Sequence, residues 1–276
     1  MAYISGNTSE SGRIIIINED TWSLEKSRLI DSGNYRINAL DDGKKTVICR
    51  RDDGKSDGFG NVDTAIENYQ VFSCGSNDAG QLGLNDIVNR STLTQIGTEG
   101  NWKSVVCGYW NTLAIKTDGT LWSWGNNWNG ELGHNNIIRM SIPTKVGTDT
   151  DWEFISAGFR HNLALKNNGT LWSWGNNWHS QLGHNDIINR SIPTKVGTDT
   201  DWEFISTNKQ IDTMEDYFVF FSLTIKNNGT VYGCGLNTSG QFGLGDLVSR
   251  SIFTQIGSGT DWESVSCGGA HIMFLK

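Results

Sequence analysis

The amino-acid sequence predicts an all-β protein made of tandem repeats, and three observations support this. The 276 residues include 33 Gly and 12 Trp but only 2 Pro, a composition typical of many short strands joined by tight turns. Trp102, Trp152 and Trp202 follow one another at a spacing of 50 residues, and Trp262 follows after 60. Segments 141–156 and 191–206 have identical sequences, which indicates a recent duplication.

One repeat, read from Trp152, contains three strand signals, at 153–156, 162–166 and 170–174. Asn168-Gly169 lies between the second and third, and predicts a tight hairpin because both residues tolerate positive φ. A fourth strand is expected near 193–196, with Pro at its first position, where the missing N–H costs no ladder bond. Such a unit cannot bury both faces alone, so successive units must stack, and radial stacking gives a β-propeller.

A recurring motif gives this architecture a family resemblance. In the repeat that begins at Trp152 the motif consists of Gly158, His161, Leu163, Leu165, Gly169, Trp172, Trp174, Gly175, Asn177, Gln181, Leu182 and Gly183. It returns in the next repeat as Gly235, Asn237, Gly240, Gln241 and Gly243. The pattern resembles the repeat of the regulator of chromosome condensation family, which implies that each repeat is one propeller blade. That family usually builds seven blades, and the present count differs.

The two ends of the array resemble complementary halves of one blade. Residues 271–276 match 161–166, in the first half of a repeat, whereas the segment from Val71 onward matches the second half. Complete units at 102–151, 152–201 and 202–261, together with a composite of 262–276 and 70–101, predict four blades. Pairing of the halves would close the ring and remove its exposed strand edges. We expect closure within one chain; the alternative is an exchange of half blades between two chains, which gives a ring of eight.

Residues 1–65 do not fit the repeat and are expected to form a separate module, with the propeller at 66–276. Strand signals at 13–18, 22–30, 34–39 and 44–51 alternate with turn-rich segments. The pattern resembles the compact β-sandwich modules at the ends of bacteriophage structural proteins. A module of this size has a small core and commonly depends on a partner, so we expect it to serve in attachment.

Charge and hydropathy exclude several functional classes. The 22 basic and 30 acidic residues give a net charge of -8, which argues against binding to the phosphate backbone of nucleic acids. Residues 1–10 lack the pattern of a signal peptide, and the longest aliphatic run, Ile14–Ile17, is far below the roughly 20 residues of a membrane span. We therefore expect neither a signal peptide nor membrane insertion.

No motif predicts catalysis, a cofactor or a metal site. The sequence lacks a Gly-rich phosphate loop, a nucleophile elbow and an HExxH pair. His134 and His184 occupy one repeat position on neighbouring blades, but no third metal ligand recurs with them. The cysteines replace apolar residues of other repeats and are interpreted as buried free thiols; they are Cys49, Cys74, Cys107, Cys234 and Cys267.

Two loops and one insertion hold the candidate contact residues. Trp128 and Trp178 follow the amides Asn127 and Asn177, a combination that suits stacking on a sugar ring or anchoring a protein partner. Packing of both Trp side chains against the next blade is the favoured interpretation, and exposure as a contact is the alternative. The third repeat carries ten extra residues within 207–221, and this insertion contributes Met214, Asp216 and Tyr217 as candidate contacts.

These features together predict a non-enzymatic structural or binding protein. The resemblance of residues 1–65 implies a bacteriophage virion component, in capsid decoration or in a tail fibre. In that setting residues 1–65 bind other virion proteins and the propeller is displayed; outside a virus, a cytoplasmic location is expected. The alternative is a lectin-like or receptor-binding adhesion protein that recognises a glycan or protein of the host surface. The exchange-factor role known in the resembling family is disfavoured by the acidic charge and the missing blades.

Overall fold

The computed structural model describes residues 15–16, 35–40, 46–51, 69–208 and 220–276, and every element in them is a β-strand. The chain divides into two compact units, Met1–Glu67 and Asn68–Lys276. Within the described ranges, no helical segment could serve as a transmembrane span.

The described residues of the first unit form one antiparallel sheet. Its strands are β1 (Ile15–Ile16), β2 (Tyr35–Leu40) and β3 (Thr46–Arg51), in the order β1-β3-β2. The strand expected at 22–30 lies outside the described residues. The sandwich-like arrangement of this module thus stays a prediction.

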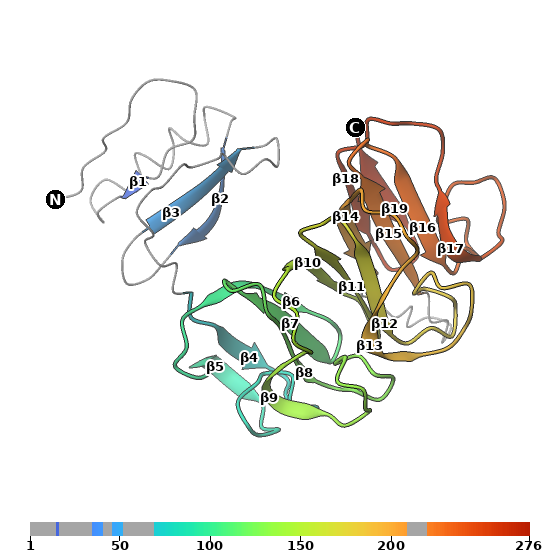
Figure 1. The fold of residues 1–276 in the computed structure, drawn as a ribbon. Coiled ribbons are helices and arrows are strands. Elements are labelled where there is room, and N and C mark those ends of the chain that lie inside the picture. Colours follow the sequence, from blue (N-terminus) through green and yellow to red (C-terminus); the bar gives the residue numbers. More distant parts are fainter. Residues whose placement is uncertain (1–14, 17–34, 41–45, 52–68, 209–219) are drawn as a thin grey trace. The chain divides into compact units, whose positions relative to one another are not determined.

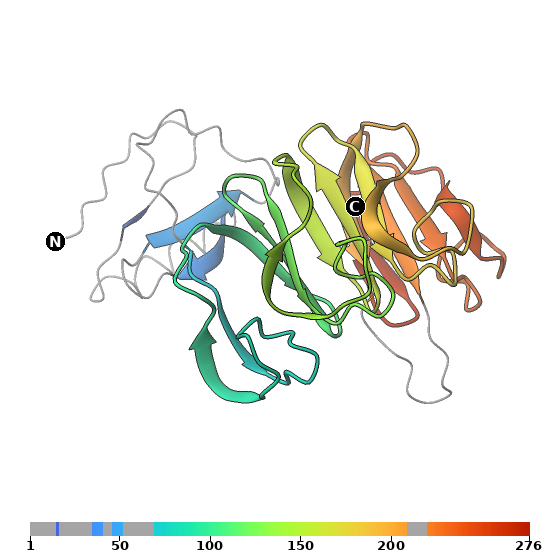
Figure 2. The same cartoon turned by 60° about the horizontal axis from the view of Figure 1, so that its bottom comes forward.

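The second unit contains three complete four-stranded antiparallel sheets, here called blades 1, 2 and 3 (Figures 1 and 2). Blade 1 comprises β6 (Trp102–Cys107), β7 (Asn111–Lys116), β8 (Leu121–Gly125) and β9 (Met140–Lys145). Blade 2 comprises β10 (Trp152–Ala157), β11 (His161–Lys166), β12 (Leu171–Gly175) and β13 (Arg190–Lys195). Blade 3 comprises β14 (Trp202–Thr207), β15 (Phe221–Lys226), β16 (Val231–Gly235) and β17 (Arg250–Gln255).

The second strand of each blade supplies the core. All six residues of β7 and of β11 are buried, because these strands lie inside their sheets and their faces are covered by neighbouring blades. Trp152 packs edge-on against Trp172 with ring centroids 5.6 Å apart, and the equivalent Trp102 packs against Trp122 at 5.8 Å. The Trp pattern that reveals the repeat in the sequence is therefore a pattern of core contacts.

Buried polar groups join each blade to the preceding one. Trp174 is buried, and its indole Nε1 donates a hydrogen bond of 2.8 Å to the backbone oxygen of Glu131 in blade 1. The equivalent Trp124 donates to the oxygen of Gln81 at 2.9 Å, and the thiol of Cys234 donates to the oxygen of Gln181 at 3.2 Å. The sulfur of Cys234 thus replaces an indole at the same repeat position.

Two further pairs of strands flank the row of blades. The N-terminal half blade is β4 (Phe72–Gly75) with β5 (Arg90–Gln95), and the C-terminal half blade is β18 (Ser264–Cys267) with β19 (Ile272–Leu275). They form separate two-stranded sheets, at the blade 1 end and the blade 3 end of the row (Figure 1). The structure thus does not show the four-bladed ring closed by pairing of the half blades that the sequence predicts.

Candidate functional site: the aromatic edge of the blades

Two kinds of loop lie at the same edge of every blade, because successive strands of an antiparallel sheet run in opposite directions. One kind joins the first strand to the second and comprises 108–110 in blade 1 and 158–160 in blade 2; of the corresponding connection in blade 3, Asn208 and Phe220 are described. The other joins the third strand to the fourth and comprises 126–139, 176–189 and 236–249. Sequence positions about 20 residues apart within a repeat thereby come together.

A chain of ring contacts runs along this edge from blade 1 to blade 3. The ring centroid of Trp110 lies 5.7 Å from that of Trp128 and 4.7 Å from that of Tyr109. Tyr109 in turn contacts Phe159 of blade 2 at 4.6 Å, and Phe159 stacks on Phe220 of blade 3 at 5.6 Å. We call these five residues, together with Trp178, the aromatic edge.

The aromatic edge has a buried base and exposed tips. Phe159 and Phe220 are almost fully buried, whereas Trp128 is 63% exposed, Trp178 57% and Tyr109 44%. Trp178 lies in blade 2 at the position that Trp128 has in blade 1. The sequence analysis favoured packing of the two Trp side chains on the next blade, and this was wrong: the structure places both largely in solvent.

A cationic group and a polar ring border the same residues. The guanidinium carbon of Arg160 lies 5.0 Å from the ring centroid of Phe159 and 5.8 Å from that of Trp110. The imidazole of His179 stacks on Phe220 with a centroid distance of 5.4 Å, and its burial lowers the pKa of His179. These contacts place polar groups against the buried base of the aromatic edge.

A buried polar network holds the Trp-bearing loops in place. The Glu131 carboxylate accepts hydrogen bonds of 2.8 Å from the backbone N and the Nδ2 of Asn129, and burial raises the pKa of Glu131. Blade 2 has Gln181 at this position, whose Nε2 donates to Asn176 Oδ1 at 2.7 Å. Asn176 Nδ2 donates to Asn129 Oδ1 at 3.2 Å, which joins the loops of the two blades. Trp128 and Trp178 therefore project from connected, well-bonded loops.

The predicted contacts Asn127 and Asn177 are fully buried and hold their own loops together. Asn127 Nδ2 donates to the backbone oxygen of Ile138 at 2.9 Å, and its Oδ1 accepts from the N of Leu132 at 2.8 Å. Asn177 makes similar bonds in blade 2, to Asp186 O at 2.9 Å and from Leu182 N at 2.9 Å. Their amides thus shape the loops from which the Trp side chains project.

The other predicted contacts, Met214, Asp216 and Tyr217, lie outside the described residues. The flanks of their segment are described: Phe159 N donates to Asn208 O at 3.1 Å, and Phe220 belongs to the aromatic edge. The two described residues that flank the segment, Asn208 and Phe220, therefore lie at this edge.

Sequence reasoning missed Tyr109, Trp110, Phe159, Arg160 and Phe220. A signal was present: the tripeptides Gly-Tyr-Trp at 108–110 and Gly-Phe-Arg at 158–160 occupy the first-to-second-strand loop that the insertion enlarges in blade 3. An alignment of the loops between the first and second strands shows large side chains at positions where a short turn requires only small residues.

The two histidines at one repeat position and the acidic pair before Trp152 have structural partners. His134 and His184 lie within 3.0 and 2.9 Å of the hydroxyls of Ser123 and Ser173, and burial lowers the pKa of His184 to about 4. Asp149 and Asp151 flank the Lys166 ammonium at 2.6 and 2.9 Å. Within the described ranges, no group of three or more His, Cys, Asp or Glu side chains could hold a metal ion.

The thiols are not all buried, as the sequence interpretation had them. Cys234 is buried and Cys267 half-buried, but Cys74 and Cys107 are exposed. Cys74 lies on β4, which within the described ranges pairs only with β5, whereas its counterpart Cys234 lies inside a complete blade. The side chain of Cys49 lies outside the described residues.

Comparisons with known proteins agree with this architecture. A family model described as "Regulator of chromosome condensation (RCC1) repeat" matches residues 70–115, 118–165, 168–207 and 228–275, and a second model of the same description matches 102–131 and 152–181. No curated protein matches the chain.

Solved structures show the same fold at low identity. The crystal structure of human WBSCR16 is 20% identical over 75% of this chain and 53% of that chain, with a TM-score of 0.64. The crystal structure of Kap60 bound to yeast RCC1 (Prp20) gives 21% identity over 74% of this chain and 49% of that one, with a TM-score of 0.63. A structure of Prp20p from Saccharomyces cerevisiae, described with its binding to Gsp1p and histones, gives a TM-score of 0.59 at 21% identity, over 72% and 50% of the two chains.

The chain thus spans about half the length of these structures. The repeat model covers most of the blades and both half blades in register. The chain belongs to the regulator of chromosome condensation (RCC1) repeat family.

Proposed function

We propose that this protein is a non-enzymatic binding protein whose repeat unit holds a protein partner at the aromatic edge. The observation that carries the proposal is the run of ring contacts over three blades with Trp128, Trp178 and Tyr109 exposed at its surface. Trp, Tyr and Arg are the residues that most often dominate the energy of protein interfaces. Rigid loops lower the entropy that such side chains lose on binding.

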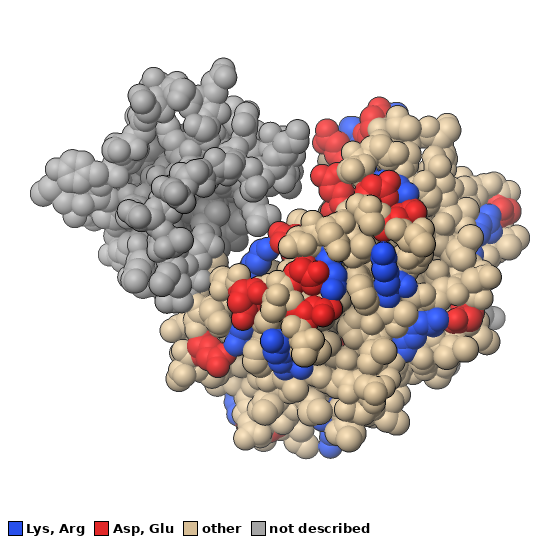
Figure 3. Space-filling model, viewed as in Figure 1, with Lys and Arg blue, Asp and Glu red and all other residues tan. Residues whose placement is uncertain are grey.

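The family gives support for a protein as the partner. The structures of yeast Prp20 name Kap60, Gsp1p and histones as its partners, all of them proteins. The net charge of -8 favours a partner with a neutral or basic surface. On the face shown in Figure 3, Lys and Arg of the described residues lie among Asp and Glu, an arrangement unlike the basic patch that nucleic acids require.

The first test is affinity capture with the purified chain and with a Trp128→Ala/Trp178→Ala variant, read by quantitative mass spectrometry. We expect a partner enriched by the parent chain to fall at least tenfold in the variant, since interface Trp residues commonly contribute about 2 kcal/mol or more. Ile192→Ala/Ile252→Ala is the matched control, because it removes exposed apolar side chains from the fourth strands of two complete blades, away from this edge.

Equal capture by the parent chain and the Trp variant would contradict the proposal. Binding to a glycan array that disappears in the Trp variant, with no protein enriched, would instead favour the lectin-like alternative.

We also propose the virion as the setting, with residues 1–65 binding other capsid or tail proteins. The support is the resemblance of that sequence to phage modules and its separation from the repeats as a compact unit. A mass-spectrometric inventory of purified virions tests it. The chain is expected in stoichiometric amounts, and its absence from the particles would refute the assignment.

The complete scaffold in this proposal is a sealed ring in which the two half blades pair to form one more blade. The support is that β18 and β19 correspond to first and second strands, and β4 and β5 to third and fourth strands. Sealing would protect the strand edges that the half blades present.

A further inference from the structure

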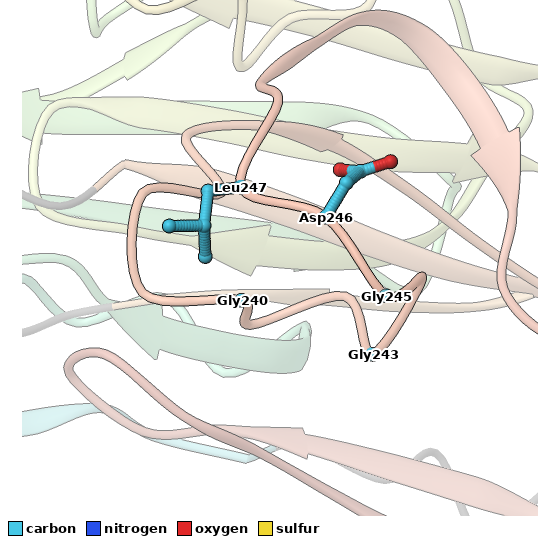
Figure 4. Close-up of a pocket in the computed structure, with 5 residues that line it drawn as sticks. All are labelled: Gly240, Gly243, Gly245, Asp246 and Leu247. Carbon is cyan, nitrogen blue, oxygen red and sulfur yellow. The ribbon is translucent and has the colours of Figure 1, made fainter.

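Blade 3 has a shallow hollow where the equivalent loops of the other repeats contact a strand of the next blade. It has a volume of about 360 Å³ and is lined by residues of the third-to-fourth-strand loop: Gly240, Gly243, Gly245, Asp246 and Leu247 (Figure 4). The equivalent loops elsewhere in the row offer a direct comparison, because the same motif builds them.

In the other repeats the fourth strand of the next blade lies against this loop. Asn85 N donates to Ser141 O at 2.8 Å, and Asn135 N donates to Ser191 O at 2.7 Å. The approach is so close that a Cβ on Gly130 would lie 2.5 Å from the Cα of Ser191. These glycines leave room for the neighbouring backbone.

In blade 3 the same space is open. A Cβ on Gly240 would meet only the side chain of Leu247, at 3.6 Å, and one on Gly245 would meet nothing within 4 Å. Gly245 N, the counterpart of Asn85 N, has no backbone acceptor among the described residues. The hollow is therefore the position of a fourth strand that blade 3 lacks as a neighbour.

The fourth strand that fits is β5. Its Ser91 has the repeat position of Ser141, Ser191 and Ser251, each of which accepts a hydrogen bond from the preceding loop. β5 carries β4 with it, and among the described residues β4 pairs with no strand on its other side. In the described part of the chain, β19 likewise pairs only with β18, next to blade 3.

The complete blades give the register of the missing pair. In blade 2, Leu163 lies opposite Ser173 and Leu165 opposite Leu171. The same register places Met273 opposite Ser73 and Leu275 opposite Val71. Met273 is 66% exposed and Leu275 56%, whereas Leu163 and Leu165 are fully buried. Pairing would bury apolar surface at both ends of the row.

The geometry of the row points to a second copy of this chain as the source of β5. Contacts between sheets follow the order of the repeats, from the blade 1 end to the blade 3 end. Sealing four blades would require a turn of about 90° between neighbours, against about 45° in a ring of eight. The row superposes on about half of longer propellers with TM-scores of 0.64 and 0.63, which fits the smaller turn.

We propose that two copies assemble about a twofold axis into a ring of eight blades, each giving β4 and β5 to the β18 and β19 of the other. This inference rests on the proposed pairing of the half blades and is independent of the partner bound at the aromatic edge.

A disulfide between β4 of one copy and β19 of the other tests the proposal. In the antiparallel ladder of β11 and β12, hydrogen-bonded and non-hydrogen-bonded pairs of opposite residues alternate. Residues 160 and 176 are a hydrogen-bonded pair, because Asn176 N donates to Arg160 O. Residues 163 and 173 are therefore a non-hydrogen-bonded pair. The matching Ser73→Cys/Met273→Cys variant of the full chain would bring its Cα atoms to about 4.5–5.5 Å, which suits a disulfide. On mild oxidation we expect a covalent species of twice the 30.6 kDa chain mass in non-reducing electrophoresis.

Two controls test whether the covalent dimer comes from a disulfide between positions 73 and 273. Ser73→Cys/Phe274→Cys places the thiols on opposite faces of the sheet and should not cross-link, and each single variant reports disulfides made by the native cysteines. Light scattering of the parent chain should give twice the chain mass without any cross-link.

A disulfide between positions 73 and 273 within one chain of monomeric mass would overturn the second copy but keep the pairing of half blades. A monomeric parent chain with no disulfide in the double variant would overturn both.

Discussion

At the scale of single residues, one repeat position shows how the neighbouring blade sets the role of a side chain. The position holds Asn111 in blade 1, His161 in blade 2 and Phe221 in blade 3. Asn111 Nδ2 donates to Asn162 Oδ1 at 3.2 Å, and His161 Nε2 lies 2.9 Å from the hydroxyl of Ser222. Because Ser222 donates its own proton to Gln181 O at 2.8 Å, it accepts the one from His161. Burial keeps this imidazole neutral and lowers the pKa of His161 to about 3.

The depressed pKa predicts that acid destabilises the fold through His161. The unfolded chain takes up a proton near pH 6.5, whereas the folded chain does not until about pH 3, so the stability that His161 contributes falls as the pH drops below 6.5. The loss is at most about 1.4 kcal/mol per pH unit. In urea unfolding at pH 7 and pH 5, His161→Asn should lose less stability than the parent chain. An equal loss in both chains would contradict the assignment.

At the scale of elements, the hairpin between the second and third strands is the most constrained part of the repeat. Gly169 has φ +74°, and a Cβ there would lie 2.1 Å from the backbone oxygen of Thr200 in the loop that leads to the next blade. Gly119 and Gly229 have the same conformation and the same close approach. The turn therefore fixes both the hairpin and the path of the chain into the following blade.

Gly169→Ala is expected to destabilise the protein more than Gly197→Ala. Both residues have positive φ, so both substitutions cost roughly 1–2 kcal/mol of backbone strain. Only position 169 adds a steric overlap with backbone, worth about 1–3 kcal/mol more, because position 197 is open. Urea midpoints of the two variants measure the difference. Similar midpoints would show that the close approach at Thr200 relaxes freely.

At the scale of the whole molecule, the row of blades presents two complementary edges whose apolar residues are exposed. In the proposed ring of eight, folding and assembly are linked, so the thermal midpoint should rise with protein concentration. Leu275→Glu should abolish that dependence and yield a monomer, because it places a charge in the new blade while leaving the half blade able to fold. Ile142→Glu is the control, since it alters an exposed residue of a complete blade. Differential scanning calorimetry at several protein concentrations measures the thermal midpoint. If the midpoint of Leu275→Glu rose with concentration as much as that of the parent chain, the proposed pairing of β4 with β19 would be contradicted.

The sequence alone determined the strands and hairpins of the repeat unit and the spacing of the repeats. Those features depend on contacts within one repeat, such as the turn at Gly169 and the packing of Trp152 on Trp172, which recur and so leave a period in the sequence. The repeat pattern favoured packing of Trp128 and Trp178 on the next blade, whereas the structure exposes both side chains.

Only the tertiary structure decided which side chains meet across blades and whether the row closes. Tyr109, Phe159 and Phe220 come from three repeats and touch only once the blades stack. Asn127 and Asn177, which resemble ligand contacts in the sequence, direct their hydrogen bonds to backbone brought back by the fold. Closure depends on the angle between neighbouring blades. Many contacts between repeats set this angle together, so the sequence of one repeat does not determine it.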